Sequence, residues 1–391
     1  MMTISSLLAE PVRNQEFPVT TKTIFLAHAA VTALPHVVVK AMEEFLRQAS
    51  LGSQEDPVIW EIVQKTRETA ARLLGCHADE IALLGPTSIG LNLVAQGLPW
   101  KPGDAVIFYG DDYPSNVYPW RALQQRGVTL IPLQPEHPGV ITWEHIESML
   151  TPSTRLVALA SCHFLSGYRI DIDTIGRNLH ERGILFCLDG IQSLGAFPVS
   201  VDHVDFLSAD SHKWLLGPCG AGIFYVRRSC QDILTPTLLG SWNVVSPGFI
   251  AQDKFAYYPG ARRYEPGTLN LPGIVGMHAA MELLLTLGVE VIANRILHLR
   301  RFFVEGLRSL GYRLYLEEFD TRPQASDKER SGIISVESRG RDIQELATRL
   351  ETHGVAFSLR RSRSGKEFLR FSPHFYNTEE ELQRVLDLMK T

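Results

Sequence analysis

Helix-like and strand-like segments alternate along the first two-thirds of this 391-residue chain, and this alternation limits the folds that it can adopt. Short apolar runs with the length of buried strands lie at 105–109, 129–133, 156–161, 184–189, 204–209 and 222–226. Polar, helix-capable stretches such as 173–182 separate several of these runs. The pattern predicts an α/β fold with a mostly parallel sheet between helices. Ligands of such sheets bind beyond the carboxyl ends of the strands.

The character of the sequence changes at about Gly276. From there we expect, in order, a long helix at 277–307, strands at 333–336 and 368–371, and a final helix from Glu379. These elements predict a smaller α+β domain. Because the chain is too long for one small domain, we expect a large domain at 20–275 and a small domain at 276–391. Residues 1–19 are expected to pack on the small domain, and 322–329 to form an exposed loop.

The composition argues against several classes of protein. The net charge is −5 and no long basic stripe is present, so nucleic acid is not an expected partner. No apolar run reaches about 18 residues, and the first residues lack the basic start of a signal peptide, so we expect no membrane contact and a cytoplasmic location. The cysteines are Cys76, Cys162, Cys187, Cys219 and Cys230, and their spacing predicts no metal site.

Lys213 is unusual because it follows an apolar strand and precedes a turn rich in glycine and proline. Its neighbours are His212 and Trp214. A lysine held in such surroundings can lose its proton and form a Schiff base with an aldehyde. The aldehyde cofactor that suits this chemistry is pyridoxal 5'-phosphate (PLP). A strand-end lysine that reaches for water is the competing interpretation.

Other residues could supply the remaining parts of a PLP site. Thr87 and Ser88 follow the apolar run 81–84 and begin a helix, where amides and hydroxyls bind phosphate or simply cap the helix. Asp189 ends a strand, where a carboxylate is costly unless it is paired. It could hold a proton on the pyridine nitrogen of PLP, or cap the next turn. Gln192 could bind the phenolic oxygen of the ring.

Together these residues resemble the class V aminotransferase family of fold-type I PLP-dependent enzymes, which includes cysteine desulfurases, kynureninase and isopenicillin N epimerase-like proteins. The matching motifs are Phe25–Ala30, Asp189-x-x-Gln192, Ser211-His212-Lys213-Trp214, Gly217-Pro218-x-Gly220-x-Gly222 and Arg263-x-Glu265-x-Gly267-Thr268-x-Asn270. They occur in the order of the family and cover nearly the whole chain. The resemblance implies the fold of these enzymes, with a large PLP-binding domain and a smaller C-terminal domain.

The resemblance also implies roles for individual residues. Lys213 would form the Schiff base and carry the proton at the substrate α-carbon, and Asp189 would hold the pyridinium. The other cofactor-binding residues would be Thr87, Ser88, Tyr113, Gln192, Ser211, His212 and Thr268. Thr268 would reach the active site of the partner across a homodimer interface. Arg370 would bind the substrate carboxylate with two parallel hydrogen bonds from its guanidinium group. His28 is a candidate for the substrate mouth or for a core histidine.

The sequence departs from cysteine desulfurases at two places. Those enzymes carry a nucleophilic cysteine on a loop ahead of the carboxylate-binding arginine. Here the stretch 358–365 has no cysteine, and none follows Cys230. Cys219, near the cofactor lysine, is the one substitute, and we assign it to a packing turn. The second departure is Phe164, which replaces an asparagine of many desulfurases, as it does in the kynureninase and epimerase branch. Persulfide formation by the usual route is therefore not expected.

Three arginines, Arg360, Arg361 and Arg363, occupy the stretch where the cysteine loop would lie. A solvated run of charges is the simpler interpretation. The alternative is that these arginines recognise a second anionic group on the substrate.

The sequence thus predicts a homodimeric PLP-dependent enzyme that forms an aldimine with a small amino acid and activates its α-carbon. Amino transfer is the first expectation. Elimination by a carbon–sulfur β-lyase and epimerisation are alternatives, because all three reactions share the first steps. A PLP-binding regulatory protein is the non-enzyme alternative, but it would not need Arg370. A nicotinamide-dependent oxidoreductase would need a G-x-G-x-x-G turn after its first strand, which this sequence lacks.

Overall fold

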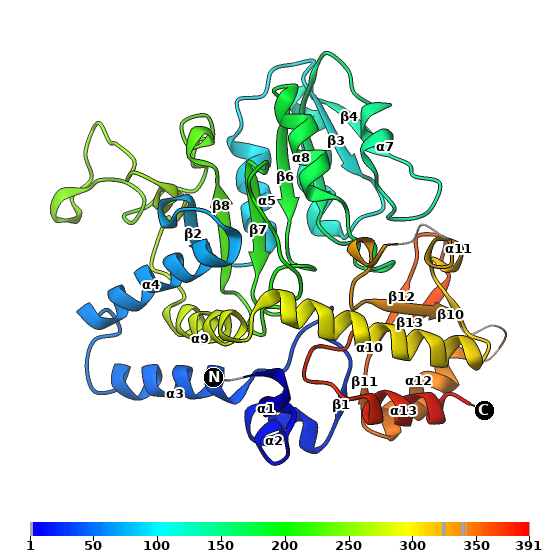
Figure 1. Cartoon of the computed structure of the whole chain (residues 1–391). Helices are drawn as coiled ribbons and strands as arrows, with labels where there is room; N and C mark the ends of the chain where they lie inside the picture. The colour runs from blue at the N-terminus through cyan, green and yellow to red at the C-terminus, as the bar shows by residue number, and fades with distance from the viewer. Residues whose placement is uncertain (1–2, 323–325, 338–339, 341, 391) are drawn as a thin grey trace.

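The structure is a computed structural model that describes residues 3–322, 326–337, 340 and 342–390. At its centre lies a seven-stranded sheet with the order β2–β8–β7–β6–β5–β3–β4 (Figure 1). Its strands are β2 (Ile81–Leu84), β3 (Ala105–Tyr109), β4 (Thr129–Leu133), β5 (Thr154–Ala160), β6 (Leu185–Asp189), β7 (Phe206–Asp210) and β8 (Gly222–Val226). Strand β8 is antiparallel to both neighbours, and the other pairs are parallel. The mostly parallel sheet predicted from the sequence is confirmed.

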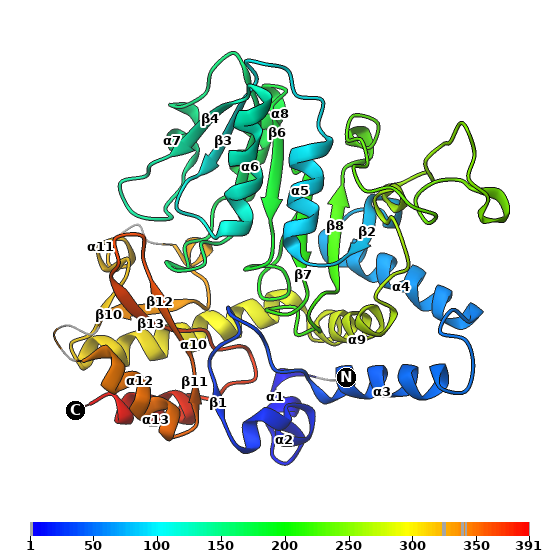
Figure 2. The same cartoon turned by 180° about the vertical axis from the view of Figure 1, so that it is seen from behind.

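Both faces of this sheet are buried, which explains why its strands read as continuous apolar runs. Helix α8 (Ile172–Glu181) covers one face, and α5 (Thr87–Gly97) and α6 (Tyr118–Ala122) cover the other (Figures 1 and 2). In β3, Ile107 belongs to the apolar core on the α8 side, whereas Val106 and Phe108 belong to the core on the α5 side. A short helix, α7 (Trp143–Glu147), follows β4.

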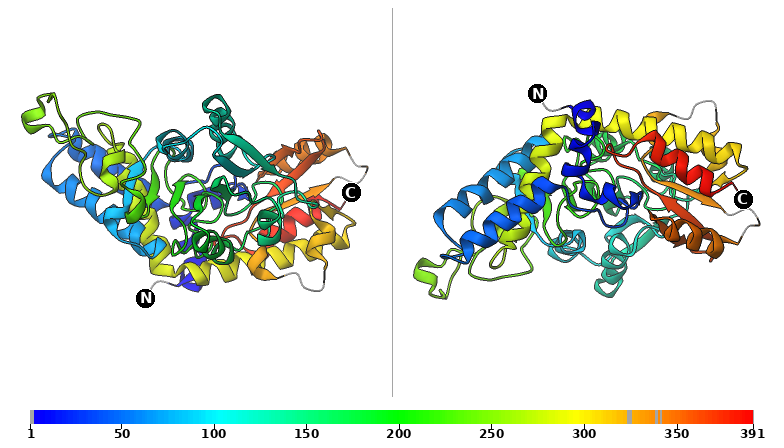
Figure 3. Two further views of the ribbon diagram at one scale, coloured as in Figure 1. Left: turned by 90° about the horizontal axis from the view of Figure 1, so that it is seen from above. Right: turned by 90° about the horizontal axis from the view of Figure 1, so that it is seen from below.

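The long helix expected at 277–307 is instead two helices, α9 (Leu271–Leu287) and α10 (Val289–Ser309), bent by 81°. Gly288 lies between them with φ 84° and ψ 119°, a backbone conformation that glycine adopts more readily than other residues. Helix α9 packs on α3 (His36–Ala49) and α4 (Pro57–Leu74) (Figure 3). The predicted two-domain division stays a prediction, and its boundary at 275/276 falls within α9.

A second, four-stranded antiparallel sheet has the order β12–β13–β10–β9. Its strands are β9 (Arg313–Leu314), β10 (Ile334–Glu337), β12 (Ser358–Arg361) and β13 (Glu367–Phe371). Leu369 and Phe371 pack in one apolar core with α10, α12 (Ile343–Thr352) and α13 (Glu379–Leu388). Because side chains alternate along a strand, Arg370 between them faces the opposite side of the sheet. That side faces the large sheet.

The N-terminal segment lies against this second part of the chain. Strand β1 (Ile24–Phe25) pairs in parallel with β11 (Val355–Ala356). Two short helices, α1 (Ile4–Leu8) and α2 (Val12–Glu16), precede it. From α2, the buried Arg13 donates to the carboxylate of Glu381 and to the carbonyl of Tyr376.

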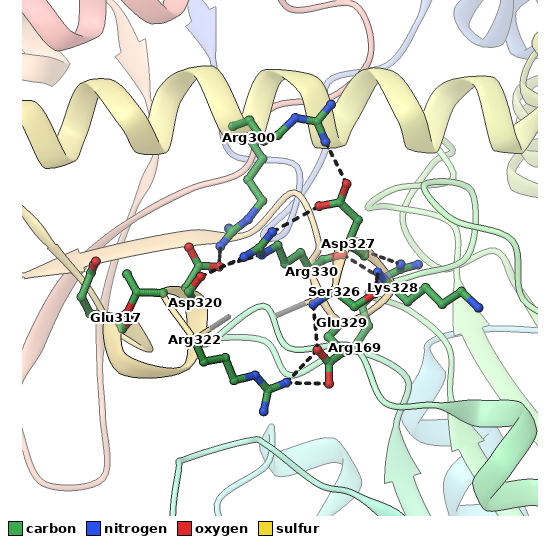
Figure 4. A network of polar contacts seen from close by, with 12 residues as sticks. Arg169, Arg300, Glu317, Asp320, Arg322, Ser326, Asp327, Lys328, Glu329 and Arg330 are labelled. Carbon is green, nitrogen blue, oxygen red and sulfur yellow. Dashed lines mark hydrogen bonds and ion pairs between the residues drawn. The ribbon is translucent and has the colours of Figure 1, made fainter. Parts of the chain in front are cut away.

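Ion pairs hold the described part of the segment predicted as an exposed loop at 322–329. Asp327 pairs with Arg301 at 2.9 Å. Glu329 pairs with Arg322 at 2.7 Å (Figure 4). The neighbouring Arg330 pairs with Asp320 of α11 (Glu317–Asp320) at 3.0 Å. Residues 323–325 of the predicted loop lie outside the described residues.

Among the described residues, no single helix has the length and apolar composition needed to cross a membrane. The bent pair α9 and α10 meets these two criteria when its helices are taken together. The same residues contain no group of three or more His, Cys, Asp or Glu side chains that could hold a metal ion.

Candidate active site

A cavity of about 310 Å³ opens at the carboxyl ends of the parallel strands, opposite the small sheet. Eight predicted site residues line it: Thr87, Ser88, Tyr113, Asp189, Gln192, His212, Lys213 and Arg370. Most of them lie at or just beyond the carboxyl ends of β2, β3, β6 and β7. These strand ends lie close together at one edge of the sheet, as expected for this topology. The cavity volume is at the lower end of the range for ligand sites, which is about 300–1,000 Å³.

Lys213 lies in the turn after β7 and is only 7% exposed. Burial lowers the pKa of its ammonium to about 8, and the positive charges of Arg370 and Arg360 act in the same direction. The carboxylate of Asp189 opposes this shift. The Nζ atom lies 5.3 Å from the ring centroid of Tyr113. At neutral pH this lysine therefore has a larger neutral, nucleophilic fraction than a solvated lysine.

Asp189 ends β6 and is 4% exposed. Its Oδ1 accepts a hydrogen bond from the amide of Ile191 at 3.1 Å. Burial raises the pKa of the carboxyl to about 6, while the Ile191 amide and the charge of Lys213 hold it down. The side chain is therefore mostly ionised at neutral pH. It is the one carboxylate among the described residues that line the cavity.

A second buried carboxylate, Asp112, was not predicted from the sequence. Burial and the charge of Asp189 raise its pKa to about 7. Its Oδ1 accepts from the amide of Tyr113 at 2.7 Å, and its Oδ2 accepts from Nδ2 of Asn116 at 3.1 Å. Asp112 thus fixes the backbone that carries Tyr113. Its position just beyond the apolar strand 105–109 was the signal that could have found it.

The N-terminus of α5 forms the polar end of the cavity. The Thr87 hydroxyl accepts from the amide of Asp210 at 2.9 Å, and Ser88 lies next to it. Nδ1 of His212 lies 2.7 Å from a carboxylate oxygen of Asp210. The free amides at the start of an 11-residue helix carry partial positive charge, which favours a phosphate group there.

Gln192 joins two walls of the cavity. Its Nε2 donates to the carbonyl of Ala29 at 3.1 Å, and its Oε1 accepts from Nε1 of Trp214 at 2.9 Å. A side-chain amide has two N–H donors, so one remains beyond the bond to Ala29. This N–H is the group that could bind a ligand oxygen.

Arg370 extends from β13 into the cavity and is 2% exposed. It donates to the carbonyl of Phe164 at 2.7 Å, and its buried Nε has no hydrogen-bond partner in the described part of the chain. Burial lowers the pKa of the guanidinium to about 9, and the charge of Arg360 adds to that effect. Because buried charges are costly unless they are paired, this side chain is suited to an anionic ligand.

Three predicted site residues do not line the cavity. His28 is fully buried, with Nδ1 2.8 Å from the carbonyl of Ser372 and Nε2 2.8 Å from the Tyr376 hydroxyl. The structure therefore places His28 in the core and not at the substrate mouth. The Ser211 hydroxyl donates to the carbonyl of Pro218 at 2.8 Å and closes the turn around Lys213. Thr268 lines a separate cavity of about 330 Å³.

The residues of the main cavity fit PLP. Lys213 can lose its proton to react with the aldehyde, Asp189 can hold a proton on the pyridine nitrogen, and the start of α5 offers hydroxyls and amides to the phosphate. Site and fold together therefore define a fold-type I PLP-dependent enzyme.

Comparison with known proteins identifies the family. The family model described as Aminotransferase class-V matches residues 24–385, and the chain belongs to this family. A probable cysteine desulfurase of Methanothermobacter thermautotrophicus is 28% identical over 400 residues, covering 95% of this chain and 94% of the relative. The predicted family and its PLP-dependent class of enzyme are thus confirmed.

Solved structures share the fold. The apo structure of a cysteine desulfurase from Thermococcus onnurineus NA1 has a TM-score of 0.88 and 24% identity, covering 100% of this chain and 98% of that one. The cystine C–S lyase C-DES, in complex with its product cysteine persulfide, has a TM-score of 0.85 and 20% identity, covering 96% and 99%. The fold class predicted from the sequence is thereby confirmed.

Proposed function

We propose that this PLP-dependent enzyme is a β-lyase that cleaves a carbon–sulfur bond of a sulfur-containing amino acid. The observation that carries the proposal is one cavity with Lys213, Asp189 and Arg370 but no cysteine among its described lining residues. The names of the similar proteins, cysteine desulfurase and cystine C–S lyase, refer to carbon–sulfur bond cleavage. They favour the lyase alternative over amino transfer, which the sequence had placed first.

Each of the three residues has a task in this proposal. Arg370 binds the α-carboxylate, and it thereby fixes the orientation of the α-carbon. Lys213, in its neutral form, takes the proton from the α-carbon. Asp189 holds a proton on the ring nitrogen, and PLP, when bound, takes up the electron pair that this deprotonation releases. The sulfur then leaves the β-carbon with the electrons of the broken bond.

The released sulfur is expected to leave as a small molecule. The turn between β12 and β13 is short, closed by hydrogen bonds from Ser362 to Lys366 at 2.8 Å and from Gly365 to Ser362 at 2.9 Å, and it contains no cysteine. All five cysteines are among the described residues, and none of them lines the cavity. Cys219 is exposed on the turn after Lys213. No thiol is therefore placed to accept sulfur from the substrate.

Incubation of the holoenzyme with L-cysteine, L-cystine, L-alanine and L-aspartate tests this function. We expect pyruvate in equal amount with sulfide or persulfide from the sulfur-containing substrates, without an added 2-oxo acid. The Cys219→Ser variant is expected to give the same products at the same rate. Turnover that requires a 2-oxo acid acceptor would show amino transfer instead, and formation of the D-isomer would show epimerisation.

We further propose that the enzyme is a homodimer with shared active sites. The segment 238–258 extends from the body of the molecule (Figures 1 and 2). Its exposed large apolar side chains are Leu238, Leu239, Val245, Phe249, Ile250 and Phe255, of which Phe249 is 77% exposed. Apolar surface of this kind is typical of protein interfaces. Thr268, away from the cavity of its own chain, is free to reach the phosphate of a partner.

Light scattering of the holoenzyme is expected to give twice the mass of one chain. The Ile250→Asp variant is expected to shift the protein toward monomers, because it places a charge in the apolar interface. Thr268→Val is expected to remain dimeric but to release PLP more readily. A monomer that retains PLP as well as the dimer would contradict the shared site.

A further inference from the structure

Two arginines, Arg360 and Arg370, reach the same cavity as Lys213. Neither forms an ion pair with an acidic side chain among the described residues. We propose that Arg360 binds a second negatively charged group, carried at the side-chain end of the substrate. This inference rests on the proposed function, and it narrows the substrate to amino acids with an acidic group beyond the β-carbon.

The strand register explains why Arg360 faces the cavity. Ser358 pairs with Arg370, and Arg360 pairs with Phe368. Residues that pair directly across two antiparallel strands lie on the same face, as do alternate residues of one strand. Arg360 and Arg370 are therefore diagonal neighbours on the face toward the large sheet.

The other two arginines of the sequence cluster have different surroundings. Arg361 lies on the opposite face of β12 and pairs with Glu367 at 2.7 Å. Arg363 pairs with Asp111 across the opening between the two sheets. Both side chains are largely exposed. Of the cluster, the structure thus assigns only Arg360 to the cavity, and the interpretation as a solvated run holds for the other two.

The charges in the cavity call for anionic ligands. Arg360, Arg370 and Lys213 face a single carboxylate, Asp189, among the described residues that line the cavity. The Nε atoms of both arginines are buried and have no hydrogen-bond partner among the residues that the structure describes. Two neighbouring guanidinium groups repel each other, and burial makes that repulsion stronger. The α-carboxylate of the substrate neutralises one of them, which leaves the other for a second anion.

The phosphate of PLP is the other anion that could reach this cavity. Its expected site is the start of α5, where Thr87 and Ser88 offer hydroxyls and amides. Arg360 comes from a different element, the edge strand β12 of the small sheet. Arg360 is therefore assigned to the substrate side chain. A carboxylate joined to the β-sulfur through a carbon atom has the required charge, as has a sulfonate bound to that sulfur.

Two probes that differ by one charge test the inference on the holoenzyme. S-carboxymethyl-L-cysteine ends in a carboxylate, and S-carbamoylmethyl-L-cysteine ends in an amide of nearly the same shape. Dissociation constants are measured from the change in the visible absorption of the bound cofactor, and pyruvate release is measured in parallel. We expect the native enzyme to bind the acid about 10- to 100-fold more tightly than the amide, as for hydrogen bonds to charged groups.

Variants on the two faces of β12 supply the controls. Arg360→Met is expected to bind both probes about equally, since it keeps the stem and loses the charge. Arg360→Lys is expected to keep part of the preference, because a lysine provides a point charge without the guanidinium fork. If Arg360→Met fails to fold, the Arg360→Lys variant still tests the role of the guanidinium group. Arg361→Met, on the opposite face, is expected to keep the whole preference.

Other outcomes would overturn the inference. If Arg360→Met weakens both probes equally, the side chain binds the α-carboxylate, and if the variant loses PLP, the side chain binds the cofactor. Preferential binding of the acid through Arg360 without pyruvate release would support the inference and contradict the proposed lyase. Equal binding of both probes by the native enzyme, with pyruvate from each, would support the lyase and contradict the inference.

Discussion

The Lys213→Ala variant is expected to lose the visible absorption band of the PLP-bound protein, near about 410–430 nm, and to lose turnover by about 10⁴-fold. Lys213 is the one lysine among the described residues of the cavity, so its loss removes both the covalent attachment of the aldehyde and the base at the α-carbon. Spectra of the native and variant proteins with equal PLP, and pyruvate release from L-cystine, measure the two effects. A native protein without the band would contradict the assignment.

The pH dependence of PLP capture provides a second readout of the same residue. Burial lowers the pKa of Lys213 to about 8, so the neutral amine accumulates as the pH rises toward that value. The rate of band formation from apoprotein and PLP is expected to rise up to about pH 8 and to level off above it. A rate that keeps rising to about pH 10 would indicate a lysine with an ordinary pKa. Lys366→Ala, which changes an exposed lysine, is expected to behave like the native protein.

The Asp189→Asn variant is expected to retain PLP but to lose about 10²–10³-fold in kcat, in the range for removal of one preorganised electrostatic contact. A neutral amide cannot stabilise a proton on the ring nitrogen as a carboxylate does. In the native enzyme, activity is expected to fall as the pH falls through about 6, because Asp189 becomes protonated there. Steady-state rates between about pH 5 and 9 measure this limb of the profile.

Asp112→Asn distinguishes the two buried carboxylates. The pKa of Asp112 is raised to about 7, and its side chain does not line the cavity. If Asp189 causes the acid limb, the limb persists in Asp112→Asn and disappears in Asp189→Asn. The reverse result would assign the limb to Asp112 and would contradict the role proposed for Asp189.

The sequence could predict the large sheet and most of the cavity because both depend on local signals. Each apolar run forms a strand, and the polar residues that follow such runs, such as Thr87, Asp189 and Lys213, necessarily gather where parallel strands end. Asp112 follows the same rule. It was not predicted because the resemblance to the family assigned a role to its neighbour Tyr113 and none to Asp112. The family membership then followed from motifs in their order.

The remaining features depend on contacts between distant segments. His28 is a core residue because both of its ring nitrogens lie within hydrogen-bond distance of Ser372 and Tyr376, which are more than 340 positions away in the sequence. Arg360 faces the cavity and Arg361 faces away because of the register between β12 and β13, which the sequence Arg360-Arg361-Ser362-Arg363 alone does not reveal. The break in the long helix was also missed, since one glycine within a helical pattern is usually tolerated.

The break between α9 and α10 allows a small change at Gly288 to cause a large displacement far along α10. From Gly288, α10 continues for 21 residues, about 30 Å, and packs in the same core as β13. If the dihedral angles of Gly288 change by about 5°, a point about 20 Å along α10 moves by about 2 Å. Such a displacement exceeds the tolerance of about 0.5 Å within which a catalytic constellation works. The reach of Arg360 and Arg370 toward Lys213 is thus set partly by a residue that touches neither substrate nor cofactor.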